Sequence, residues 1–184
     1  MADDTRGADE SADQTLIARW EAGDERAATA LVERHAPALA RFALSLGVRA
    51  DVEEIVQDTF VRAFGSLDSF RNESTLRTWL FTIERRLVAD RRRADRRRRG
   101  EVATDDTDAA SSYDALDALV ADETESRVRQ AVERLSPKQR EIFTLRVNEG
   151  LSYKEIAEIV GSTEGAARVH YHNAMRAVKE SLYV

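Results

Sequence analysis

Residues 136–182 read SPKQREIFTLRVNEGLSYKEIAEIVGSTEGAARVHYHNAMRAVKESL and contain the start and stop signals of three helices. The Ser-Pro-Lys-Gln run at 136–139 supplies an N-cap, a proline at the first helical position and a capping-box glutamine. Ser152 and Glu155 form a second capping box, and Gly161 ends the helix that they begin. A short helix, a turn containing glycine and a longer helix are typical of a helix-turn-helix, whose second helix enters the major groove of DNA.

The last helix of this stretch separates apolar from polar side chains at a helical period. Its buried side is expected to contain Ala167, Tyr171, Ala174, Met175, Val178 and Leu182. Its exposed side is expected to contain Arg168, His172, Arg176 and Lys179, with Val169 and Asn173 at the edge and Ser162 or Thr163 at the start. The exposed side is therefore the predicted DNA-reading face.

A second unusual stretch, RTWLFTIERRLVADRRRADRRRR, occupies residues 77–99. Its last part, residues 85–99, holds nine arginines and two aspartates in a chain of net charge -6, and we call it the arginine stripe. A charged helix face is usually only solvated, but few carboxylates stand at i+4 to pair with these arginines. A polyanion is the expected partner, because arginine binds phosphates with paired hydrogen bonds. Trp79 and Phe81 have two possible roles: they could stack on the bases of single-stranded DNA, or they could pack in the core.

Composition favours helices, since only 7% of the 184 residues are aromatic and only two are proline. The absence of cysteine excludes disulfides, thiolate metal ligands and thiol nucleophiles. His170 and His172 point to different sides of a helix, so no metal site is expected. The carboxylates at 53–58 have no histidine, lysine or glycine-rich phosphate loop at a defined spacing, so they do not indicate an active site. No cofactor, no small-molecule substrate and no catalytic activity are expected.

The chain divides at an acidic segment. Residues 101–125 hold nine carboxylates and no lysine or arginine, which predicts a linker with at most a weak helix at 113–120. The predicted fold class is all-α, with two small helical domains joined by this linker. The expected boundaries are a disordered acidic tail at 1–13, a first domain at 14–99, the linker at 100–125 and a second domain at 126–184. Neither a membrane span nor a secretory signal is expected.

Apolar periods predict further helices in the first domain. One begins near Leu16, and a second covers residues 27–46 and is expected to bend at Pro37. Asp51 is expected to cap a third helix, with Glu54 as its capping-box partner. The buried stripe of the third helix is expected to contain Ile55, Val56, Phe60, Ala63, Phe64 and Leu67. In the fourth helix, Leu76, Leu80, Ile83 and Leu87 form the core face.

Three segments together resemble one protein family. They are DVEEIVQDTFVRAF from residue 51, FRNESTLRTWLFTIERRLVADRRR from residue 70, and LSPKQREIFTLRVNEGLSYKEIAEIVGSTEGAARVHYHNAMRAVK from residue 135. In this order, around an acidic spacer, they resemble a bacterial RNA polymerase sigma factor of the extracytoplasmic-function (ECF) group. The resemblance implies a non-catalytic subunit that binds core RNA polymerase and directs promoter recognition and melting. The alternative is a stand-alone helix-turn-helix transcriptional regulator. This alternative does not account for the motifs in residues 51–99.

The resemblance also implies a role for individual residues. The face that docks on the clamp helices of core polymerase contains Asp51, Glu54, Gln57, Asp58 and Arg62. The loop that captures a flipped base of the minus-ten element contains Phe70, Arg71, Asn72, Ser74 and Thr75. The minus-ten strand-binding helix contributes Arg77, Trp79, Arg85, Arg86, Asp90, Arg92 and Arg93. The minus-thirty-five contacts are Thr163, Arg168, Val169, His172, Asn173, Arg176 and Lys179.

The chain departs from the family pattern at two places. Arg86 stands where many members have asparagine, and GAARVHYHNAM at 165–175 replaces the frequent GTVKSRLHRAR, so the promoter sequence is not implied. The implied partners are core RNA polymerase, promoter DNA as duplex and as non-template single strand, and an anti-sigma factor. The implied location is the bacterial cytoplasm, or the membrane when an anti-sigma factor holds the protein there. The acidic linker is expected to mask the arginine stripe until polymerase binds.

Overall fold

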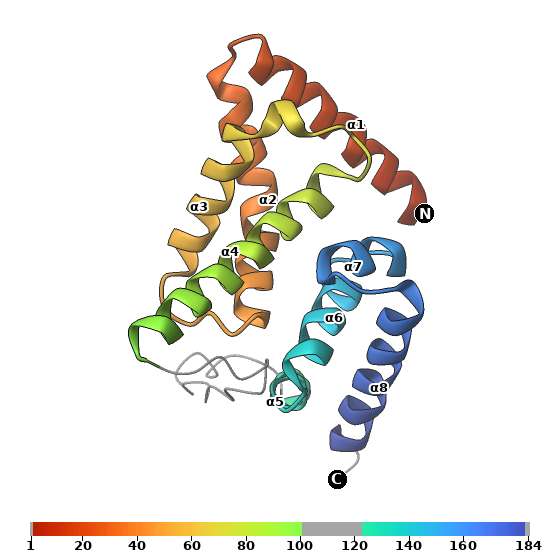
Figure 1. The fold of residues 1–184 in the computed structure, drawn as a ribbon. Helices are drawn as coiled ribbons and strands as arrows, with labels where there is room; N and C mark the ends of the chain where they lie inside the picture. Colours follow the sequence, from red (N-terminus) through yellow and green to blue (C-terminus); the bar gives the residue numbers. More distant parts are fainter. Residues whose placement is uncertain (1, 101–122, 183–184) are drawn as a thin grey trace.

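The structure, a computed structural model, describes residues 2–100 and 123–182, and within these ranges it contains helices and no strand (Figure 1). The first domain consists of α1 (Ala2–Glu21), α2 (Glu25–Ser45), α3 (Val52–Gly65), the short 3-10 helix η1 (Leu67–Ser69) and α4 (Leu76–Arg98). The second domain consists of α5 (Glu123–Glu133), α6 (Pro137–Val147), α7 (Tyr153–Val160) and α8 (Glu164–Leu182). The predicted all-α class is confirmed. Most of the acidic linker, with the weak helix expected at 113–120, lies outside the described residues.

The beginning of the chain differs from the sequence-based expectation. Residues 2–13, expected as a disordered tail, belong to α1. The acidic turns of this helix find partners on α2, where Arg34 pairs with Asp9 at 2.5 Å and with Asp13 at 3.0 Å. Asp13 is buried and also lies 3.0 Å from Nε2 of His35. The acidic composition of residues 1–13 predicted disorder. Composition does not reveal that carboxylates of this segment have ion-pair partners on a neighbouring helix.

Two further helix boundaries differ from expectation. Asp51 does not cap α3 with its side chain, because its φ of 63° and ψ of 27° place it in the left-handed region rather than the extended region of an N-cap. The capping box that we expected between Asp51 and Glu54 is therefore wrong. α5 is a separate helix that the sequence pattern did not reveal, and it begins at Glu123, inside the range expected as linker.

The other described helix boundaries follow local signals, and the start and stop signals predicted for α6 and α7 are confirmed. Thr75 caps α4 by accepting a hydrogen bond from the Thr78 N–H at 3.1 Å. Both expected capping boxes are present, at the start of α6 and at the start of α7. Gly161 ends α7 with a φ of 64°, a left-handed conformation that glycine adopts at little cost. α6, α7 and α8 therefore form the predicted helix-turn-helix region.

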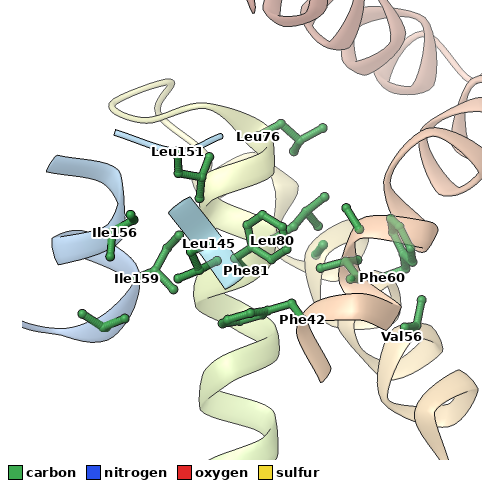
Figure 2. Packing of buried hydrophobic residues seen from close by; sticks show 14 of the residues in the cluster. Phe42, Val56, Phe60, Leu76, Leu80, Phe81, Leu145, Leu151, Ile156 and Ile159 are labelled. Atoms are coloured by element: carbon green, nitrogen blue, oxygen red, sulfur yellow. The ribbon is translucent and has the colours of Figure 1, made fainter. Parts of the chain in front are cut away.

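One buried apolar cluster crosses both domains (Figure 2). Phe42 and Phe81 of the first domain meet edge to face, with ring centroids 5.0 Å apart. Leu145 and Ile156 of the second domain belong to the same cluster and are completely buried. α4 packs against α7, and α2 packs against α6. The two domains are therefore in direct contact along an apolar seam.

Candidate functional site

The outer face of α3 is the predicted polymerase-docking face. Asp51, Glu54, Gln57 and Arg62 are exposed, whereas Asp58 is partly buried. Arg91 of α4 donates hydrogen bonds to Asp58 at 2.6 Å and to Glu54 at 2.8 Å. The Asp58 carboxylate, helped by Glu54, raises the pKa of Arg91 above its ordinary value. The arginine stripe thus orients two carboxylates of the predicted docking face.

The loop at 70–75, predicted to capture a flipped base, borders a cavity of about 240 Å³. Asn72, Ser74 and Thr75 line one side of this cavity, and Asp13 and Gln14 of α1 line the other. Asn72 has a φ of 55°, which turns the loop sharply. With Phe70, which also lines the cavity, the structure brings four of the five predicted loop residues together around a hollow. It adds α1 as a wall that the sequence analysis did not predict.

The aromatic residues near this loop divide between surface and core. Trp79 is partly buried and packs on Phe70, with ring centroids 5.0 Å apart. Phe81 has an exposed fraction of 0% and packs within the apolar seam. Trp79 and Phe70 therefore stay beside the loop, while Phe81 is a core residue and does not reach solvent.

Arg77 and Arg85 of α4, both predicted to bind the minus-ten strand, contact the second domain. Arg77 forms an ion pair with Glu149, and Arg85 forms one with Glu141. The side chains of Glu149 and Glu141 have exposed fractions of 0% and 5%. Arg41 of α2 adds two hydrogen bonds to Glu149, at 2.9 and 3.1 Å. Two predicted DNA-binding arginines are thus occupied by carboxylates.

The rest of the predicted strand-binding set lies further along α4. Arg86 and Arg93 are exposed, and Arg92 donates a hydrogen bond to the Leu46 carbonyl at the end of α2. Asp90 pairs with Arg93, and this hydrogen bond holds the pKa of Asp90 below its ordinary value. The distal part of the arginine stripe remains largely open to solvent and presents a cationic surface.

The polar face of α8 is open to solvent as predicted. Thr163, Arg168, Val169, His172, Arg176 and Lys179 are exposed, and Asn173 is partly buried. The hydroxyl of Thr163 accepts a hydrogen bond from the Ala166 N–H at 3.2 Å, so this residue also caps the helix. The Arg168 guanidinium lies 5.1 Å from the centre of the Tyr153 ring. This cation–π contact orients the Arg168 side chain. The helix therefore presents its predicted contacts as one surface.

Sequence reasoning missed four charged residues at the domain contact. They are Arg41, Glu84, Glu141 and Glu149. Glu84 is completely buried in α4, and neither of its oxygens has a hydrogen-bond partner among the described residues. Burial, together with the nearby Glu149 carboxylate, raises the pKa of Glu84 to about 9. One signal in the sequence could have indicated that Glu84 is buried. Glu84 lies beside the core face of α4, one residue before Arg85.

Residues 2–100 and 123–182 contain no cluster of three metal-ligating side chains. Within the same ranges, none of the helices combines the length and the apolar character that a membrane-spanning segment requires.

Two family models match the chain: Sigma-70 region 2 at residues 31–98 and Sigma-70, region 4 at residues 125–178. Over 163 residues the chain is 36% identical to the RNA polymerase sigma factor NccH of Alcaligenes xylosoxydans xylosoxydans, covering 86% of this chain and 88% of that protein. Over 175 residues it is 30% identical to the ECF RNA polymerase sigma-E factor of Escherichia coli, with coverage of 90% and 92%. The sigma factor RpoE of Bartonella quintana, solved with the anti-sigma factor NepR, matches with a TM-score of 0.65 at 30% identity, covering 85% of this chain and 96% of that chain.

Proposed function

This chain belongs to the ECF group of RNA polymerase sigma factors, and on that premise we propose how its residues divide the work of transcription initiation. The first domain, residues 14–99, binds core RNA polymerase through the outer face of α3 and the minus-ten element through loop 70–75 and α4. The second domain, residues 126–184, reads the minus-thirty-five element through α8. Residues 100–125 connect the two domains.

The observation that carries the proposal is the polar face of α8. Arg168 and His172 lie in its first half, where a helix that follows a helix-turn-helix turn meets base edges. Arg176 and Lys179 lie one to two turns later and suit contacts with phosphates, which position the helix without reading sequence. A role in promoter recognition accounts for both the base-contacting and the phosphate-contacting residues of this face.

The first domain supports the same assignment by its charge and shape. The cavity beside Asn72 and Thr75 offers hydrogen-bonding groups next to the paired aromatic rings of Phe70 and Trp79. Pulling a base out of the duplex costs a few kcal/mol, which contacts of this kind can offset. The exposed arginines further along α4 provide the phosphate contacts that hold the separated strand.

Catalysis, location and regulation complete the proposal. The chain contributes no catalytic step, since RNA synthesis belongs to the core polymerase that it directs. It acts in the bacterial cytoplasm, and an anti-sigma factor keeps it inactive there or at the membrane. The match to RpoE, solved with the anti-sigma factor NepR, supports regulation of this kind.

A reconstituted transcription assay tests the function. Purified protein is added to core RNA polymerase on a library of promoter fragments, and initiated transcripts are sequenced. Transcripts that start from a shared promoter motif are the expected result. DNA retention without transcripts would instead indicate the stand-alone regulator.

A charge reversal on α3 tests the docking face. Arg62→Glu should abolish co-purification with core polymerase, because it places a repulsive charge on an exposed position of the proposed contact. The matched control is Arg26→Glu, the same charge change at an exposed position near the start of α2. Helical circular dichroism should be unchanged in both variants. Equal polymerase binding by both would place the docking face elsewhere.

A further inference from the structure

The cavity beside loop 70–75 has two walls that come from different parts of the chain. Phe70, Asn72 and Thr75 line it from the loop, and Glu10 and Gln14 line it from α1 (Figure 1). Its volume of about 240 Å³ is below the range of about 300–1,000 Å³ that is typical of sites for drug-sized ligands. The cavity therefore suits one small planar group, such as a single base.

The charge of the lining decides which part of a nucleotide can enter. Glu10 and Glu73 contribute carboxylates from opposite walls, Asp13 adds a third, and none of the described lining residues is a lysine or an arginine. Carboxylates repel a phosphate group, whereas an uncharged base can pack its flat face on the Phe70 ring. The cavity thus suits a base, while the sugar–phosphate backbone stays outside it.

The carboxylates on α1 differ in what they already bind. Asp13 is buried, and its Oδ1 lies 3.0 Å from nitrogens of both Arg34 and His35. Glu10 is exposed, and no hydrogen bond or ion pair joins its side chain to another described residue. Gln14 lies four residues after Glu10, on the same face of the helix, and is also exposed. Asp13 therefore holds α1 against α2, while Glu10 can accept a hydrogen bond from a ligand.

An ionised carboxylate can only accept hydrogen bonds, so it selects a base by its donors. Cytosine, adenine and guanine each carry an exocyclic amino group, whereas thymine offers a ring N–H between two carbonyl oxygens. A carbonyl oxygen placed against the Glu10 carboxylate is repelled, and both acceptors then lack a donor. The amide of Gln14 can donate as well as accept, so it suits the neighbouring atoms of any amino-bearing base. The α1 wall therefore discriminates against thymine.

We propose that α1 forms the base-selecting wall of this pocket, with Glu10 accepting a hydrogen bond from the exocyclic amino group of an unpaired minus-ten base. The ligand class is a nucleobase that bears an amino group, and thymine at this position is disfavoured. This inference rests on the proposed function, since it takes loop 70–75 as the minus-ten capture loop. It assigns base selection to a helix that lies outside residues 31–98, the range that matches Sigma-70 region 2.

Glu10→Gln in holoenzyme assembled with core RNA polymerase tests the inference. The amide keeps the shape of the side chain but adds a donor, so it also tolerates a carbonyl edge. The holoenzyme transcribes a barcoded promoter library with a randomised minus-ten element, and the initiated transcripts are sequenced. With wild-type protein we expect thymine to be depleted about tenfold at one minus-ten position, and with Glu10→Gln we expect this depletion to disappear.

The matched control is Glu21→Gln, which makes the same change at an exposed position at the end of α1. Glu21 does not line the cavity, so this variant should keep the wild-type depletion of thymine. Base preferences at the other minus-ten positions should be the same in all three proteins.

Base analogues test the amino group directly. A bubble template with an unpaired minus-ten element removes the cost of opening the duplex, so that only binding of the strand is compared. At the selected position, the preferred base is replaced by its counterpart without the amino group, which is uracil for cytosine and hypoxanthine for adenine or guanine. Wild-type holoenzyme should bind the replaced strand about tenfold more weakly, and Glu10→Gln holoenzyme should bind both strands alike.

Three results would overturn the inference. They are the absence of a thymine-depleted position with wild-type protein, a depletion that persists in Glu10→Gln, and an equal loss in both proteins when the amino group is removed. If Glu10→Gln loses helical circular dichroism, Glu10→Asp replaces it, because the charge is kept but the carboxylate is withdrawn by one methylene. A weaker depletion of thymine is then expected, and an unchanged depletion would contradict the inference.

The same library separates this failure from failure of the proposed function. If wild-type holoenzyme produces promoter-specific transcripts but Glu10→Gln has the same base preferences as Glu21→Gln, only the base-selecting role of α1 is wrong. If wild-type protein and core polymerase produce no transcripts on any promoter fragment, the proposed function itself is wrong.

Discussion

At the scale of single residues, Glu84 is a buried acid that costs folding free energy when it is ionised. Its carboxyl group is completely buried in α4 without a hydrogen-bond partner among the described residues. The cations near this region are already engaged, since Arg41 and Arg77 bind Glu149 while Arg85 binds Glu141. Burial therefore favours the neutral acid and raises the pKa of Glu84 from 4.5 to about 9.

This residue makes the stability of the protein depend on pH. Its pKa is higher in the folded than in the unfolded chain, so its contribution is fully present below pH 4.5 and decreases as the pH rises toward 9. The free energy of unfolding should fall by up to about 1.4 kcal/mol for each pH unit in this window. Glu84→Gln cannot ionise and should remove most of that slope.

Urea unfolding at pH 6 and at pH 8.5 provides the measurement for Glu84→Gln. The control is Glu33→Gln, which changes an exposed carboxylate on α2 and should keep the wild-type dependence on pH. Parallel pH profiles for wild type and Glu84→Gln would show that Glu84 ionises freely in the folded protein.

At the scale of elements, α8 combines structural and reading roles on separate faces. Ala167, Ala174 and Val178 are buried against the second domain, whereas Arg168 and His172 face solvent. The Tyr153 ring on α7 lies under two guanidinium groups, with Arg146 at 4.8 Å and Arg168 at 5.1 Å from its centre. α7 thus orients the first base-contacting residue proposed on α8.

Two substitutions on α8 should separate base reading from phosphate binding. Arg168→Ala should change which minus-thirty-five sequences are preferred and cost about 1 to 3 kcal/mol on the best site. Lys179→Ala should weaken binding to all sequences alike and reduce the dependence of affinity on salt. Binding to a randomised duplex library, followed by sequencing of the retained fragments, measures both effects. Equal, sequence-independent losses from the two variants would contradict the assignment.

At the scale of the whole molecule, the apolar seam joins the two domains energetically. Phe81, Leu145 and Ile156 are completely buried in one cluster that both domains share. Separating the domains exposes this apolar surface to water, which costs a free energy of about 25 cal/mol for each Å² exposed. The ion pairs that Arg41 and Arg77 form with the buried Glu149 carboxylate add a preferred orientation to this non-directional attraction. The two domains should therefore unfold together while they are closed.

Calorimetry provides a measurement of this coupling. Wild-type protein should unfold in a single cooperative transition, with agreement between calorimetric and van't Hoff enthalpies. Glu149→Lys should split the transition in two, because separated domains unfold independently. The control is Glu158→Lys, the same charge change at an exposed position of α7, which should keep one transition. Two transitions in the wild-type protein would show that the seam is too weak to couple the domains.

The sequence by itself determined the helices whose signals are local. The capping boxes at Ser136 and Ser152 and the stop at Gly161 require only residues within one or two turns, and all three are present in the structure. The helical period of α8 separated its buried from its exposed side for the same reason. The order of three long motifs also indicated the family, which the comparisons confirmed.

Only the tertiary structure decided which charges meet. Arg77 and Glu149 are 72 residues apart, and Arg41 and Glu149 are 108 residues apart, so no local pattern connects them. Asp9 of α1 likewise pairs with Arg34 of α2, and Asp51 takes a left-handed conformation that the local pattern did not predict. An exposed arginine and an arginine bound to a buried carboxylate look alike in a sequence. Packing between distant helices decides between them, because it removes water and places the partner.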